Sequence, residues 1–248
     1  MIETPNYQFH RKPRFSANHV AEYLTTQNAT QREAVIRKAK FPRKVSVIAY
    51  SQALPAIGKF LSSNSGDTSY FDDILTRLAA KERREQGYNR DEAQRCQAAI
   101  NAFMATFTES TAKRCRFSHG PQDVAFSISG VRINVRLDAP IFEETPDGQG
   151  FSGGCVLIMA STDDARKNIE DRKKHVAALI HWALEETSSQ FEPLPRLCMS
   201  FDPFGGDVVR APKSIDRLRK SITSSCHEVA ARWDSIEPPS GYDGPDWK

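Results

Sequence analysis

The sequence predicts a mixed α/β (α+β) protein, with a central sheet of about five strands flanked by helices and preceded by an all-helical N-terminal extension. Two patterns indicate this fold class. Apolar residues recur every three or four positions through most of residues 16–107, which is the helical period. Beyond residue 120, alternating or continuously apolar segments that are typical of strands stand between further helical patterns.

The composition of the chain is that of an ordinary globular protein. It has 248 residues, of which 39% are hydrophobic and 26% are charged. We expect an extended or disordered start at 1–15, a helical N-terminal region at 16–88, an α/β core at 89–235 and an exposed tail at 236–248.

Capping residues mark the predicted helices of the N-terminal half. Ser16 is a predicted N-cap of the first helix. Thr30 and Glu33 form a Thr-x-x-Glu capping box for a second helix, which Pro42 ends. Further helices are predicted at 52–63, at 69–85 and from Asn89 onward.

The core is expected to begin with a strand pair. Residues 123–129 and 131–138 alternate apolar and polar side chains, and Ser129-Gly130 between them is a tight-turn signal. A polar loop follows at 143–152, and 155–160 is a continuously apolar run, typical of a strand buried on both faces. The remaining elements are a helix capped by Ser161 and Asp164, a strand at 197–201, a turn into Val208-Val209 and a last helix capped by Ser214.

Basic residues are concentrated in the first half of the chain. Residues 1–120 hold 19 Lys and Arg against 11 Asp and Glu, and residues 121–248 hold 15 against 20, so +8 and −5 sum to the net charge of +3. This asymmetry suggests a polyanionic partner or docking between the halves, although solvated helix faces and salt bridges also explain it. The candidate nucleic-acid contacts are Arg37, Lys38, Lys40, Arg43 and Lys44 after a helix-turn-helix-like pair, and Arg132 and Arg136 on one strand face.

The cysteines and the N-terminus indicate the compartment. Five cysteines are widely spaced with no Cys-x-x-Cys pair, so we expect reduced, mostly buried thiols and a cytoplasmic protein. The N-terminus lacks the layout of a secretory signal, and no apolar run approaches the roughly 20 residues that a membrane helix needs, so no membrane partner is expected.

The order of elements over residues 90–210 resembles the core of the PD-(D/E)XK nuclease-like superfamily. In that family an Asp near the end of the second core strand and an acid on the third hold Mg²⁺ or Mn²⁺, and a Lys on the third strand orients water. Asp138 stands at the position of the first acid, whereas Gly154 and Val156 occupy those of the second acid and the lysine. The whole chain also resembles a group of uncharacterised bacterial proteins, through segments 14–24, 40–42 and 211–214.

The resemblance implies a degenerate site that other residues could complete. Glu143 and Glu144 would join Asp138 as metal ligands. Glu92 or Glu109 beside the first core helix would add another acid. The catalytic residues would be Asp138 and a migrated lysine on or before the crossover helix: Lys173, Lys174 or Lys167. Asp138 could equally cap a turn at the end of its strand.

Three functional hypotheses follow from the sequence. The first is a catalytically degenerate nuclease-like-fold protein of bacterial type that binds DNA or RNA, a bacterial protein partner, or both. The second is an active nuclease of defence or toxin type that depends on Mg²⁺ or Mn²⁺ and has a migrated site. The third is an effector, toxin or regulatory interaction module of a stress or defence locus, with no cofactor; no cofactor-binding fingerprint occurs in the chain.

Overall fold

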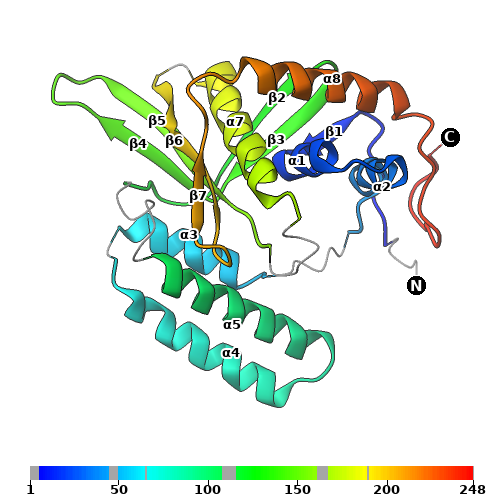
Figure 1. Cartoon of the computed structure of the whole chain (residues 1–248). Helices are drawn as coiled ribbons and strands as arrows, with labels where there is room; N and C mark the ends of the chain where they lie inside the picture. The colour runs from blue at the N-terminus through cyan, green and yellow to red at the C-terminus, as the bar shows by residue number, and fades with distance from the viewer. Residues whose placement is uncertain are drawn as a thin grey trace.

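A computed structural model describes residues 6–44, 50–64, 66–107, 116–160, 167–188 and 190–247. It confirms the mixed α+β class, with helices preceding the main strands. The single sheet of about five strands was wrong, because the strands form two sheets. One has three strands in the order β1-β3-β2, and the other has four in the order β4-β5-β6-β7 (Figure 1).

The three-stranded sheet contains the predicted strand pair and one strand that the sequence did not reveal. Strands β2 (Gln122–Ile128) and β3 (Val131–Leu137) are antiparallel, and a turn with positive φ at Ser129 and Gly130 joins them. Strand β1 (Arg14–Ser16) runs parallel to β3. Residues 6–15 are therefore not disordered, since their last residues pair with the sheet; three residues are too few to show an alternation.

The four-stranded sheet begins immediately after β3. Strands β4 (Ala139–Glu144) and β5 (Gly150–Leu157) form an antiparallel hairpin, so the predicted polar loop at 143–152 was wrong at both ends. Strand β6 (Glu192–Asp202) lies parallel to β5, and β7 (Asp207–Arg210) pairs antiparallel with β6. The hairpin was missed because acidic and glycine residues, which are poor strand formers, dominate its sequence.

The described helices are α1 (Ala17–Thr25), α2 (Ala29–Lys40), α3 (Ala53–Ser63), a 3-10 turn η1 (Thr68–Phe71), α4 (Asp72–Arg84), α5 (Tyr88–Phe107), α7 (Ile169–Thr187) and α8 (Asp216–Arg232). Within the described residues, no helix is both long enough and apolar enough to cross a membrane.

The predicted caps had mixed outcomes. The Ser16 cap is confirmed, because its hydroxyl accepts from the N–H of His19 at 3.1 Å. The Thr30–Glu33 box was wrong, since α2 begins earlier and Asn28 caps it. The Ser214 cap was also wrong, because α8 begins at Asp216 and has no side-chain cap. The caps proposed for α7, Ser161 and Asp164, lie outside the described residues.

The helices cover two hydrophobic cores. Helices α1, α2 and α8 pack with the buried face of the three-stranded sheet, and α7 contacts both sheets, most extensively β6. Helices α3, α4 and α5 pack together against β4 to β6 (Figure 1). The helices of the predicted N-terminal region are thus shared between the two cores instead of forming one layer.

The C-terminal tail is docked on the N-terminal segment, although many of its residues are exposed. The Asp243 carboxylate accepts from the backbone N–H groups of Asn6 at 2.8 Å and Tyr7 at 3.1 Å. The ring of Tyr242 lies edge-on to Phe41, with ring centroids 5.1 Å apart. The two ends of the chain therefore lie side by side (Figure 1).

Candidate nucleic-acid interface

One face of the three-stranded sheet is buried and the other is open to solvent. Along β3, Val131, Ile133, Val135 and Leu137 are buried, and the residues between them point the opposite way. Arg132 and Arg136 are exposed on that outer face, as the alternation predicted. On β2, Ser127 lies opposite Arg132 and Asp123 lies opposite Arg136, and both are exposed. We call Arg14, Arg132 and Arg136 together the arginine face.

Strand β1 adds the third arginine to this face. Arg14 pairs with Arg132 in the parallel register and is likewise exposed. The two Cα atoms on neighbouring strands are about 5 Å apart, and Arg132 and Arg136 are separated by about 13 Å along β3. Arg11 and Lys12, in the segment that leads into β1, are also exposed. Sequence reasoning missed Arg14 because nothing in the local pattern predicts that β1 pairs with β3.

The arginines of this face form no ion pair among the described residues, although two acids lie near Arg136. Within the part of the chain that the structure describes, none of the three takes part in an ion pair, and Arg132 only donates through Nε to Asn134 Oδ1 at 3.3 Å. Of the two acids beside Arg136, Asp123 is opposite it on β2, and Asp138, at the end of β3, interacts with it electrostatically. Guanidinium groups that remain free can donate two parallel hydrogen bonds to a phosphate. The arginine face therefore has the chemistry of a phosphate-binding surface.

The predicted basic cluster on α2 contains a lysine that is buried. Lys40 is only 2% exposed, and its ammonium donates to the carbonyl oxygens of Trp233 at 2.7 Å and Ile236 at 2.9 Å. These carbonyls lie at the C-terminal end of α8, where acceptors have no partner within the helix. Burial lowers the pKa of Lys40, and nearby Asp234 raises it. Lys40 is thus a structural cap and not a phosphate contact.

The other residues of this cluster differ in whether their side chains bond to neighbouring groups. Arg37 donates to Glu33 at 2.5 Å and to the carbonyl of Glu237 at 3.0 Å, and Arg43 donates to the hydroxyl of Tyr7 at 3.1 Å. Two lysines remain at the surface: Lys38, which lies 3.7 Å from Glu22, and Lys44. The cluster does not present five free cations on one surface.

Asp138 lies where β3 ends and β4 begins. One oxygen of its carboxylate accepts from the N–H of Leu157 at 2.8 Å, so this side chain replaces a backbone acceptor at the end of the β4–β5 ladder. Burial raises the pKa of Asp138 to about 6; the Leu157 bond and Arg136 lower the pKa, and Asp123 raises it. The contacts fit the alternative that the sequence left open, a cap at a strand end.

The structure does not bring the proposed metal ligands together. Glu143 and Glu144 follow Asp138 along β4, so their Cα atoms lie about 17 and 20 Å from it. Glu143 instead pairs with Arg196 at 2.7 Å. Among the described residues, no group of three or more His, Cys, Asp or Glu side chains is placed to hold a metal ion. The donor set that the resemblance requires for Mg²⁺ or Mn²⁺ is thus not assembled by these residues.

The proposed catalytic lysines have other partners. Lys173 is fully buried, and its Nζ lies 2.5 Å from Glu170 and 3.8 Å from Asp207, so its nearest carboxylates do not include Asp138. Lys174 is exposed and lies 3.4 Å from Asp171. Both lysines are therefore placed in ion pairs of α7 and its neighbours.

Close packing explains why the third core strand lacks the acid. A Cβ atom at Gly154 would come within 2.8 Å of Leu137 Cδ1, and one at Gly153 would overlap Leu197. Val156 is 4% exposed and belongs to the core. A carboxylate at 154 and a lysine at 156 would thus require the sheet to separate from its neighbours.

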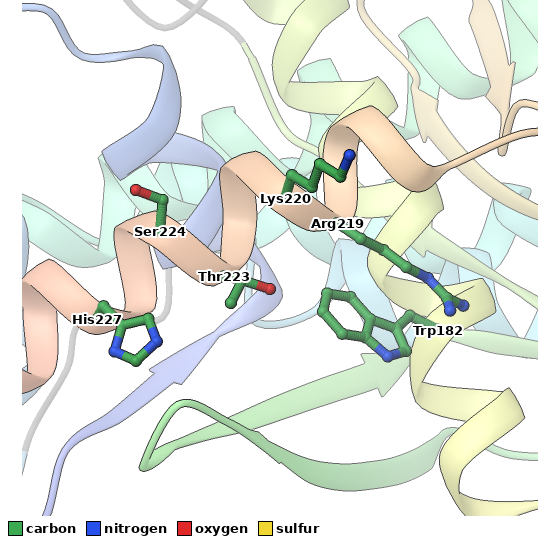
Figure 2. Close-up of a pocket in the computed structure, with 6 residues that line it drawn as sticks. All are labelled: Trp182, Arg219, Lys220, Thr223, Ser224 and His227. Atoms are coloured by element: carbon green, nitrogen blue, oxygen red, sulfur yellow. The ribbon is translucent and has the colours of Figure 1, made fainter.

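A pocket of about 460 Å³ lies between α7 and α8 (Figure 2). Trp182 of α7 forms its apolar part and contacts Phe126 of β2, with ring centroids 5.7 Å apart. The guanidinium of Arg219 lies 5.0 Å from the Trp182 ring centroid. The rest of the lining comes from α8: Lys220, Thr223, Ser224 and His227. Nothing in the sequence pattern marked this pocket, because its residues are far apart in the chain.

Comparison with models of known protein families and with curated proteins found no match for this chain.

Proposed function

We propose that this chain binds nucleic acid through the arginine face and does not cut it. The observation that carries the proposal is a solvent-exposed sheet face on which Arg14, Arg132 and Arg136 lie without an ion-pair partner in the described part of the chain. Three positive charges on this face stand against the acid Asp123 opposite Arg136. Phosphate contacts of this kind provide affinity that depends little on sequence.

The contacts of the residues that a nuclease would use support the proposal that this chain does not cut nucleic acid. The Asp138 carboxylate accepts a hydrogen bond from the N–H of Leu157. Lys173 lies within ion-pair distance of Glu170 on α7 and Asp207 on β7, and Glu143 forms an ion pair with Arg196. The residues that the resemblance assigns to catalysis therefore perform structural roles in this fold. These structural roles fit a protein that has a nuclease-like arrangement of elements and binds nucleic acid without cutting it.

Fluorescence anisotropy with short labelled DNA and RNA tests the proposal. We expect affinity to fall steeply as salt rises, because each neutralised phosphate releases counterions. Replacing Arg132 and Arg136 together with Gln is expected to weaken binding about tenfold or more and to reduce the slope of log affinity against log salt by about 2.

The matched control replaces two exposed arginines of α4, Arg83 and Arg84, with Gln, which removes the same charge far from the sheet face in sequence. That variant should keep its affinity within about twofold. Equal losses in both variants would mean that net charge and not the arginine face drives binding. Metal-dependent cleavage of the substrates by the wild-type protein, abolished in Asp138→Asn, would contradict the non-cutting half of the proposal.

A further inference from the structure

The pocket between α7 and α8 has the features of a site for a flat ring near a phosphate chain. Trp182 is partly exposed, the Arg219 guanidinium lies over its ring, and the lining residues include the cations Arg219 and Lys220 but no acid. A ring that enters the pocket would therefore meet the indole and the guanidinium together. Figure 2 shows the indole beneath Thr223, with Arg219 beside it and His227 further along α8. Nucleobases stack on aromatic side chains regardless of base identity, and neighbouring cations hold the backbone.

Two acids near the pocket are already engaged. Glu186 accepts from the indole N–H of Trp182 at 3.2 Å, and Glu185 forms an ion pair with Arg219. These contacts fix the orientation of the indole and of the guanidinium. The acids therefore position the two side chains that a ring would meet. Figure 2 shows that Lys220 points away from Trp182 and that His227 lies further along α8.

The pocket and the arginine face lie on opposite sides of one hairpin. Phe126, which contacts Trp182, points to the buried face of β2, and the next residue, Ser127, lies opposite Arg132 on the outer face. The turn at Ser129 and Gly130 closes the hairpin a few residues away. A path from Arg132 around this turn to Trp182 measures on the order of 20 Å. Single-stranded sites of about 4–16 nucleotides cover such a length.

We propose that the chain prefers single-stranded nucleic acid, because a strand held on the arginine face passes around the β2–β3 turn and places one unstacked base in the pocket against Trp182. This inference rests on the proposed function and names its substrate class. A duplex cannot occupy the pocket in this way, since its bases are paired and stacked.

Three probes of equal length test the inference: an oligothymidine, a strand of abasic sites with the same phosphates, and a duplex. We expect the wild-type protein to bind oligothymidine about fivefold or more tightly than the abasic strand, which is the contribution of one stacked base. Thr223→Phe, which fills the space above Trp182, should remove this preference and leave the affinity for the abasic strand unchanged.

Ser221→Phe is the matched control, because Ser221 is an exposed residue of the same helix that does not line the pocket. It should retain the preference. Trp182→Leu should lose the preference, and thermal unfolding shows whether each variant is folded. If the wild-type protein binds all three probes equally, or if folded Thr223→Phe keeps the preference, the pocket assignment is overturned while the proposed function stands. If no probe binds, the proposed function fails and the inference with it.

Discussion

Two sets of basic residues in this chain differ in whether their side chains are bonded within the protein or exposed to solvent. The cluster on and after α2, Arg37 to Lys44, is dense in sequence, yet Lys40 is buried against α8 and Arg37 and Arg43 are bonded to neighbouring groups. The arginine face is assembled from strands more than a hundred residues apart, and none of its arginines forms an ion pair within the described residues. Density of charge along the chain is therefore a poorer guide to a phosphate-binding surface than position on an uncovered sheet face.

Removing the ammonium of Lys40 should produce the largest effect on stability. Lys40→Met leaves several carbonyls at the end of α8 without their charged donor, and we expect the free energy of unfolding to fall by about 2–4 kcal/mol. Urea denaturation measures this loss. Lys44→Met, an exposed neighbour, should change stability by less than about 0.5 kcal/mol. A stable Lys40→Met variant with weakened nucleic-acid binding would break the comparison, since Lys40 would then be a contact.

The second largest effect concerns the acid at the end of the arginine face. The folded protein holds the proton of Asp138 up to a pKa of about 6, above the value of 3.8 that is usual for an aspartate. The native state therefore binds more protons than the unfolded state between these values, and the contribution of Asp138 to stability is lost as pH rises through that window.

Asp138→Asn keeps an acceptor for the Leu157 N–H but cannot ionise. We expect the variant to exceed the wild type in stability by about 1–3 kcal/mol at pH 7, with the difference shrinking toward zero near pH 4. Urea denaturation at several pH values measures this difference. A variant that is less stable than the wild type at pH 7 would mean that a cation holds Asp138 in its charged form.

A smaller effect is expected from the arginine that the sequence did not reveal. Arg14→Gln should weaken nucleic-acid binding about fivefold and lower the salt slope by about 1, with little change in stability. Anisotropy at several salt concentrations measures both quantities. Arg217→Gln, an exposed position on α8, serves as the control. An unchanged slope in Arg14→Gln would remove β1 from the proposed surface.

The smallest effect should come from the exposed lysines of the α2 cluster. Replacing Lys38 and Lys44 together with Gln is expected to change nucleic-acid affinity by less than about twofold, since screening weakens distant charges. The same titrations measure this change. A loss as large as that of the Arg132 and Arg136 double variant would show that α2 belongs to the interface.

The sequence was informative where local periodicity matched the local structure. Alternation along β2 and β3 predicted both strands and the exposure of Arg132 and Arg136. The burial of Lys40 also had a signal, because it follows Ile36 by four residues and therefore shares the apolar face of α2. That signal was outweighed by the basic neighbours of Lys40.

Other features depend on contacts between distant segments. The pairing of Arg14 with Arg132, the docked tail and the Trp182 pocket each join residues that are far apart in the chain. The glycines of β5 resemble a loop in sequence and are required by close approach to Leu137 and Leu197. No local pattern contains this information.

Arginine-specific chemical labelling with and without a bound oligonucleotide tests the central claim most directly, because it compares the two basic regions in one sample. Mass spectrometry of the labelled peptides would report each side chain separately. We expect nucleic acid to protect Arg14, Arg132 and Arg136 and to leave the labelling of Arg37 and Arg43 unchanged. Protection of Arg37 and Arg43 with continued labelling of the arginine face would contradict it.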